Sequence, residues 1–127
     1  MSGTVHDLAG KRVYLAAEDG PPLRSDRDAL ALVSDSFAHS PDWIALPVGR
    51  CGDEFFQLRT RILGDVAQKL VNYQLRLAIV GDVTPFVAES TALRDFIREA
   101  NRGRQIWFVA SLAELRERLQ ARGGAPS

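Results

Sequence analysis

Cysteine and histidine are scarce in this sequence. Cys51 is the single cysteine in the 127 residues, so no disulfide can form within them, which fits a reducing cytoplasm. His6 and His39 are the two histidines, and no Cys/His spacing typical of zinc ligands is present. No Gly-x-Ser-x-Gly nucleophile motif occurs either. We therefore predict a cytoplasmic protein with no metal site and no cofactor, and we assign no catalytic residue.

Long hydrophobic segments are missing as well. The longest apolar runs have about six residues, whereas a membrane-spanning helix needs roughly 20. The N-terminal residues show neither the basic flank nor the apolar centre of a signal peptide. These features predict a soluble protein without a membrane partner.

An excess of one charge is also lacking. Sixteen basic residues balance 16 acidic ones, which gives a formal net charge of +0. This balance argues against a protein that binds polyanions, so we predict no nucleic-acid partner. Fourteen of the basic residues are arginines, which would suit phosphate binding but is better explained by the codon use of a GC-rich genome.

What remains is an ordinary globular composition. The chain is 46% hydrophobic and 25% charged, close to the average for folded domains, and its length suits one domain. We predict a single domain over residues 1–121. A flexible tail is predicted over residues 122–127, where glycine, proline and serine accumulate.

Strand-like and helix-like segments alternate along the chain. Strands are predicted at Val5–Leu8, Arg12–Ala17, Trp43–Val48, Leu75–Val80 and Ile106–Ala110. Helices are predicted from Ser25, over Asp53–Tyr73, from Ser90 to Gly103 and from Ser111. The three inner strands are apolar on both faces, as is typical of parallel strands covered by helices. We therefore predict an α/β fold with a four- to five-stranded, mostly parallel sheet, an antiparallel N-terminal hairpin and about four helices.

Three helix ends carry recognisable signals. Ser25 and Asp28 have the spacing of a capping box, and so do Ser111 and Glu114. Gly103 is predicted to end its helix in the left-handed conformation that glycine adopts easily.

Several segments together resemble a known bacterial family. They are Asp53–Thr60, Gln68–Tyr73, Leu75–Asp82, Ala92–Phe96 and Asn101–Gly103. These segments are similar to the family catalogued as domain of unknown function 4180, and the resemblance extends from about Arg12 to Leu119. The resemblance implies no particular activity.

The predicted order of strands and helices also resembles that of STAS domains, which occur in anti-sigma-factor antagonists and sulfate transporters. Those domains are non-enzymatic switches that bind partner proteins, and some bind nucleotides. The resemblance implies a regulatory or protein-binding module in the bacterial cytosol, with a protein partner or self-association as a homodimer. The antagonists carry a phosphorylated serine after the third strand, whereas Arg50–Phe55 at that place contain no serine or threonine. The acidic pair Asp53 and Glu54 could only mimic its charge.

A second hypothesis places a pocket at the carboxyl ends of the strands, where parallel sheets bind ligands. The candidate ligand-binding residues there are Arg24, Arg50, Asp53 and Asp82. They would serve a small enzyme or a small-ligand-binding domain. Structural roles explain the two carboxylates as well, because Asp53 suits the first turn of a helix and Asp82 suits a turn.

The polar face of the predicted long helix is a candidate interface. It carries Arg59, Gly64, Gln68, Lys69 and Asn72. A glycine inside a helix costs about 1 kcal/mol relative to alanine, and it is tolerated where another chain approaches closely. The face therefore predicts contact with a second copy of the chain or with a protein partner, and a solvated face with an incidental glycine is the alternative.

Overall fold

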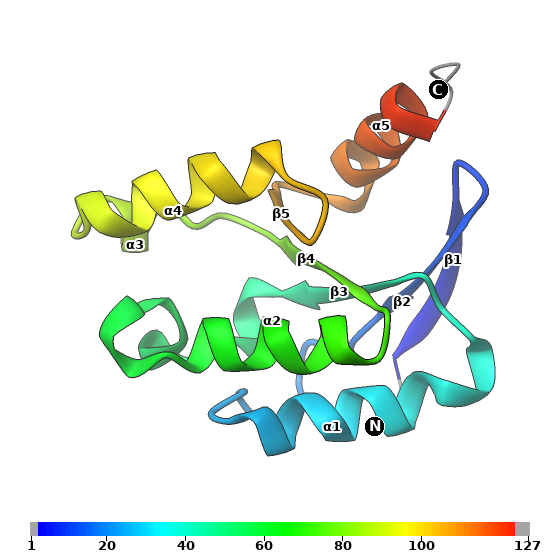
Figure 1. The fold of residues 1–127 in the computed structure, drawn as a ribbon, viewed down its shortest axis with the longest axis horizontal. Coiled ribbons are helices and arrows are strands. Elements are labelled where there is room, and N and C mark those ends of the chain that lie inside the picture. The colour runs from blue at the N-terminus through cyan, green and yellow to red at the C-terminus, as the bar shows by residue number, and fades with distance from the viewer. Residues whose placement is uncertain (1–2, 124–127) are drawn as a thin grey trace.

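The computed structural model describes residues 3–123. Within this range the chain forms a five-stranded sheet and five α-helices (Figure 1). The strands are β1 (Thr4–Leu8), β2 (Lys11–Leu15), β3 (Trp43–Pro47), β4 (Arg76–Val80) and β5 (Ile106–Val109). The helices are α1 (Asp26–Ser36), α2 (Ile62–Asn72), α3 (Thr84–Val87), α4 (Thr91–Arg102) and α5 (Leu112–Gly123). None of the helices in these residues is long and apolar enough to cross a membrane.

The strands lie in the sheet in the order in which they occur in the chain. β1 pairs antiparallel with β2, and β2, β3, β4 and β5 pair parallel with one another. The register places Ala45 of β3 beside Ala78 of β4. The predicted α/β fold, with its mostly parallel sheet and its antiparallel hairpin, is therefore confirmed.

Three helices cover one face of the sheet, and the last helix covers the other face. Since each right-handed crossover steps in the same direction across the sheet, the connecting helices α1, α2 and α4 pack on the same side. Helix α5 follows the last strand and lies against the opposite face, where it contacts both β1 and β5. The sheet is thus the middle layer of three, although α5 alone supplies the third layer among the described residues.

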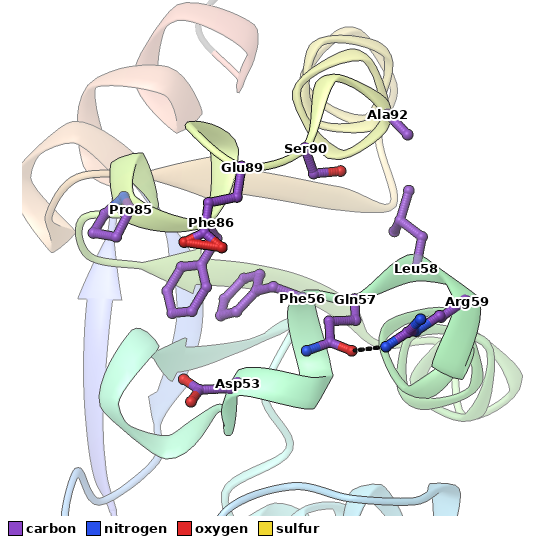
Figure 2. Close-up of a pocket in the computed structure, with 10 residues that line it drawn as sticks. All are labelled: Asp53, Phe56, Gln57, Leu58, Arg59, Pro85, Phe86, Glu89, Ser90 and Ala92. Atoms are coloured by element: carbon purple, nitrogen blue, oxygen red, sulfur yellow. Dashed lines mark hydrogen bonds between the residues drawn. The ribbon is translucent and has the colours of Figure 1, made fainter.

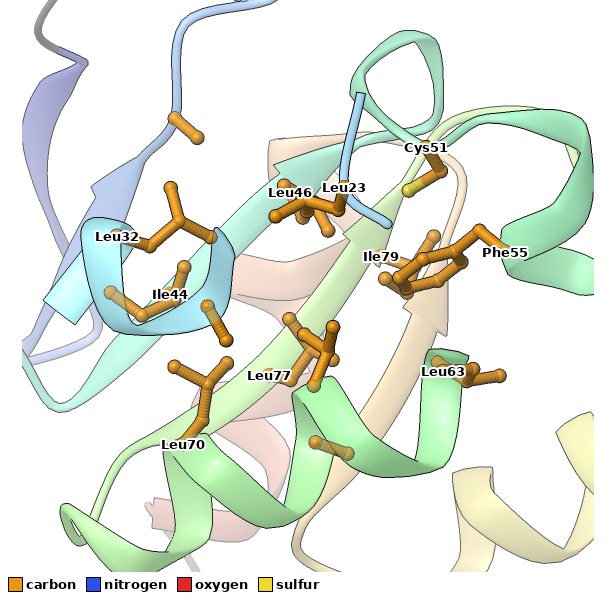
Figure 3. Close-up of a cluster of buried hydrophobic side chains, with 14 of the residues drawn as sticks. Leu23, Leu32, Ile44, Leu46, Cys51, Phe55, Leu63, Leu70, Leu77 and Ile79 are labelled. Carbon is orange, nitrogen blue, oxygen red and sulfur yellow. The ribbon is translucent and has the colours of Figure 1, made fainter. Parts of the chain in front are cut away.

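Both faces of the inner strands are apolar, as predicted. On one face Ile44 and Leu77 meet Leu32 of α1 and Leu70 of α2 (Figure 3). On the other face the indole rings of Trp43 and Trp107 lie beneath α5, with their centroids 4.7 Å apart. The small side chains of Ala45 and Ala78 leave room for these two large rings on the same face.

The predicted helix over Asp53–Tyr73 is wrong. The segment forms two 3₁₀ turns, Asp53–Phe56 and Leu58–Thr60, and α2 begins only at Ile62. Arg61 has a φ of 65°, which no α-helix continues through. The Thr60 hydroxyl donates to the Glu54 carbonyl over 2.8 Å and holds the two turns together.

Helix ends agree with the sequence in part. The Asp28 carboxylate accepts from the Ser25 N–H over 3.2 Å, and the Ser111 hydroxyl accepts from the Glu114 N–H over 3.2 Å, so both capping positions are used. Gly103 is extended, with a φ of −87°, so its predicted left-handed conformation is wrong. Helix α5 continues to Gly123, and the rest of the predicted tail lies outside the described residues.

Burial of the sheet face under α1 and α2 predicts a large cost for truncating Leu77. This side chain is 1% exposed, and Leu77→Ala should lower the free energy of unfolding by about 2–5 kcal/mol through lost burial and a residual cavity. Leu30 of α1 is 39% exposed, so Leu30→Ala should cost less than about 1 kcal/mol. Urea unfolding measures both, and losses of equal size would contradict the packing described.

Candidate functional site

A cavity of about 790 Å³ opens at the carboxyl-terminal edge of the sheet (Figure 2). One wall comes from the connection that follows β3, and the other comes from the connection that follows β4. The lining residues are Asp53, Phe56, Gln57, Leu58, Arg59, Pro85, Phe86, Glu89, Ser90 and Ala92. This is the edge of a parallel sheet at which ligands bind, and we take the cavity as the candidate site.

Two phenylalanines form the apolar wall of the cavity. The rings of Phe56 and Phe86 stack with their centroids 4.3 Å apart and their planes at 25°. Phe55 meets the Phe56 ring edge-on at 5.2 Å, deeper in the core. Phe56 is therefore fixed from both sides, whereas Phe86 on the short helix α3 is half-buried and lies open to the cavity.

Asp82 fixes the start of α3 and does not line the cavity. Its carboxylate accepts from the Thr84 N–H over 2.9 Å, which closes a turn directly before the helix. Hydrogen bonds from the Thr84 hydroxyl and N–H hold the pKa of this exposed carboxyl below its usual value. The stability that such a carboxylate contributes is present above its ordinary pKa and is lost as the pH falls. Asp82 thus has the structural role that the sequence left open.

Arg50 is a buried structural residue. Its Nε donates to the Pro21 carbonyl over 2.8 Å, and its Nη1 donates to the Ala17 carbonyl over 2.7 Å. Both acceptors belong to the connection between β2 and α1, so the guanidinium ties that connection to the end of β3. A side chain at Gly20 would place its Cβ 2.5 Å from the Arg50 Cζ, which explains a glycine at this position.

The candidate ligand-binding residues do not gather around the cavity. Arg24 is exposed beside α1, and its backbone N–H donates to Asp28 over 2.8 Å. Arg50 and Asp82 hold loops, as described. Asp53 is the one of the four predicted residues that lines this cavity.

The predicted interface residues divide into three places. Arg59 lines the cavity, where its Nη2 donates to the Gln57 side-chain oxygen over 3.3 Å. Gly64, Gln68 and Asn72 follow at intervals of four residues and share one exposed stripe of α2, with Gln68 donating to Asn72 over 2.9 Å. Lys69 faces α1 instead and forms an ion pair with Asp26 at 3.7 Å.

Nothing in the chain itself requires a glycine at position 64. A Cβ there would meet no atom within 4 Å, so the position is open.

Phe86 is a site residue that the sequence did not predict, because no helix is predicted between Val80 and Ser90, where α3 forms. An aromatic residue directly after a Pro in a loop at a strand's carboxyl end was the available signal.

The Cys51 thiol is buried and neutral. Burial raises its pKa from 9.0 to about 12, and the neighbouring Arg50 charge offsets part of that effect. Its Sγ lies 3.6 Å from the Pro47 carbonyl. A thiol with this pKa is almost entirely protonated at neutral pH and is therefore a poor nucleophile.

The other metal-binding and nucleophilic side chains are dispersed. Within residues 3–123, no three His, Cys, Asp or Glu residues gather in a way that could hold a metal ion. His6 forms a hydrogen bond with the Thr4 hydroxyl at 2.8 Å, and His39 stacks on Tyr14 with centroids 6.0 Å apart. His6 lies on β1 and His39 lies after α1, and neither of these segments lines the cavity.

Comparison with known proteins gives a family. A family model described as "Domain of unknown function (DUF4180)" matches residues 8–119, which is most of the chain. The chain therefore belongs to this family, and the resemblance seen in its segments is confirmed. No curated protein and no solved structure matches the chain.

The buried Arg50 predicts a stability effect that an exposed arginine lacks. Arg50→Lys keeps the charge but cannot reach both carbonyl acceptors, so it should lower the free energy of unfolding by about 1–3 kcal/mol. Arg24→Lys is the matched control and should change it by less than about 0.5 kcal/mol. Urea unfolding measures both variants, and equal changes in their free energies of unfolding would contradict the structural role of Arg50.

The buried thiol predicts a pH dependence of stability. Because the pKa of Cys51 is higher in the folded chain, the buried thiol contributes fully to the free energy of unfolding below pH 9.0. This contribution is lost progressively between pH 9.0 and about 12. In that window the free energy of unfolding of the wild type should fall by up to about 1.4 kcal/mol per pH unit more than that of Cys51→Ala. Urea unfolding at two pH values in the window measures the difference, and parallel slopes would contradict it.

Proposed function

We propose that this member of the DUF4180 family is a protein-binding module that acts as a regulator in the bacterial cytosol. Its partner inserts a side chain into the cavity between residues 53–59 and 85–92. The observation that carries the proposal is the wall of Phe56 and Phe86 within a rim of polar side chains. Apolar anchor pockets surrounded by polar groups are typical of the energetically important centres of protein interfaces.

The exposed stripe of α2 extends this contact surface. Arg59 lines the cavity and lies three residues before the start of α2. Gly64, Gln68 and Asn72 then continue along the exposed side of the helix. A partner anchored in the cavity would rest on this polar stripe, and the open space at Gly64 accommodates a close approach.

Two nucleophilic side chains of the connections after β3 and β4 favour binding over nucleophilic catalysis. The Ser90 hydroxyl accepts from the Leu93 N–H over 3.1 Å and so serves as the cap of α4. The Cys51 thiol is neutral and buried. The order of strands and helices, which resembles that of STAS domains, supports a switch-like binding module by analogy of architecture.

A small-ligand-binding domain or small enzyme is the alternative function. The volume of about 790 Å³ falls within the range of small-molecule pockets, roughly 300–1,000 Å³. In that case the Phe56–Phe86 wall would hold an apolar part of the ligand, and Asp53, Gln57 and Glu89 would orient its polar groups.

Native mass spectrometry of the protein purified from its own host separates the two functions. The wild type should retain a protein of discrete mass, and Phe86→Ser should lose it because the apolar wall is halved. Phe37→Ser is the matched control, since Phe37 is 75% exposed at the end of α1, at the opposite edge of the sheet. This variant should retain the partner.

Two results would contradict the proposal. One is a partner that Phe86→Ser retains as well as the wild type does, with unchanged folding by circular dichroism. The other is a small molecule, instead of a protein, that is lost with Phe86, which would establish the alternative function.

A further inference from the structure

Two carboxylates beside the aromatic wall have no partner within the described residues. Asp53 and Glu89 both line the cavity, one from each connection, and both are exposed. Neither forms an ion pair or a side-chain hydrogen bond with residues 3–123; the ion pairs there join Asp26 with Lys69, and two further pairs lie along α4. The Phe56–Phe86 end of the cavity therefore carries uncompensated negative charge.

The cation among the lining residues lies at the other end of the cavity. Figure 2 shows the Arg59 guanidinium beyond Gln57, well away from Phe86, Asp53 and Glu89. Arg59 donates to the Gln57 side-chain oxygen over 3.3 Å. It does not neutralise the carboxylates at the aromatic end, so that charge is left for an incoming group.

We infer that the partner's anchoring side chain is an arginine, which enters between Asp53 and Glu89 and packs against Phe86. The inference rests on the proposed function and names the chemistry of its partner. An arginine has an apolar stem that can cover the phenyl wall and a charged head that can meet both carboxylates. Charge complementarity of this kind selects the partner and orients it, even where each exposed ion pair adds little affinity.

Arginine suits this cavity better than other anchors do. A leucine or phenylalanine would fill the apolar wall but would leave both carboxylates facing its apolar surface. An acidic side chain would be repelled by Asp53 and Glu89. The planar guanidinium also stacks on aromatic faces and donates to two carboxylates at once, which a lysine ammonium does less well.

Peptide titrations followed by ¹H–¹⁵N NMR test the inference. The probes are acetyl-Gly-Arg-Gly-amide and acetyl-Gly-norleucine-Gly-amide, each added up to about 20 mM because one side chain binds weakly. The arginine peptide should shift the amides of residues 53–59 and 85–92 and bind about fivefold more tightly than the norleucine peptide. Its advantage should vanish at about 1 M salt, where the Debye length falls to ~3 Å.

A double variant and a matched control assign the effect to the two carboxylates. Asp53→Asn with Glu89→Gln should reduce the affinity for the arginine peptide about fivefold, to that of the norleucine peptide. Asp95→Asn with Glu99→Gln removes the same charge from the solvent side of α4 and should leave the affinity unchanged.

Contradictory outcomes separate this inference from the proposed function. Equal affinity for the two peptides, an equal loss in both double variants, or no shift by the arginine peptide would overturn the arginine anchor. The protein-binding function would still stand if the complex from the host depends on Phe86. If that complex does not depend on Phe86, the function fails as well, whatever the peptides show.

Discussion

The cavity exists because β3 and β4 are neighbours in the sheet and run in the same direction. Their pairing, from Trp43 beside Arg76 to Pro47 beside Val80, brings the carboxyl ends of both strands to one edge. The two following connections must therefore start side by side, and Phe56 of the first meets Phe86 of the second.

Burial of both strands on both faces holds the pairing of β3 with β4 in register, because a slip by one residue would exchange the faces of Leu77 and Ala78.

The sheet brings the connections side by side, and polar contacts hold each connection in place. Arg50 binds the carbonyls of the β2–α1 connection, Thr60 joins the two 3₁₀ turns, and Asp82 sets the start of α3. Each contact satisfies a backbone group that a loop at the sheet edge leaves without a helix or strand partner. The aromatic wall is thereby held by packing and hydrogen bonds, whereas the polar side chains of the rim stay exposed for contact. A packed aromatic wall with an exposed polar rim is a suitable arrangement for a docking site.

The sequence predicted the sheet well, because continuous apolar runs such as the one in β3 are hard to explain except as buried parallel strands. It failed at the segment before α2. Phe55, Leu58 and Ile62 have helical spacing, but Phe55 and Leu58 lie in two successive 3₁₀ turns, and nothing in Arg61 indicates the positive φ that precedes α2. The site was likewise predicted only in part. Asp53 was predicted because it follows a strand, and it does line the cavity. Arg50 was predicted by the same reasoning, but only the fold shows that its Nε and Nη1 already donate to carbonyl oxygens.

In the proposed function, the rim around Phe56 and Phe86 meets a partner protein. Photo-crosslinking in living host cells tests it directly, with p-benzoylphenylalanine placed at the exposed rim position of Gln57 and, separately, at the exposed position of Arg116 on α5. A protein adduct of one discrete mass is expected from position 57, and none of that mass is expected from position 116. The same adduct from both positions, or no protein adduct from position 57, would contradict it.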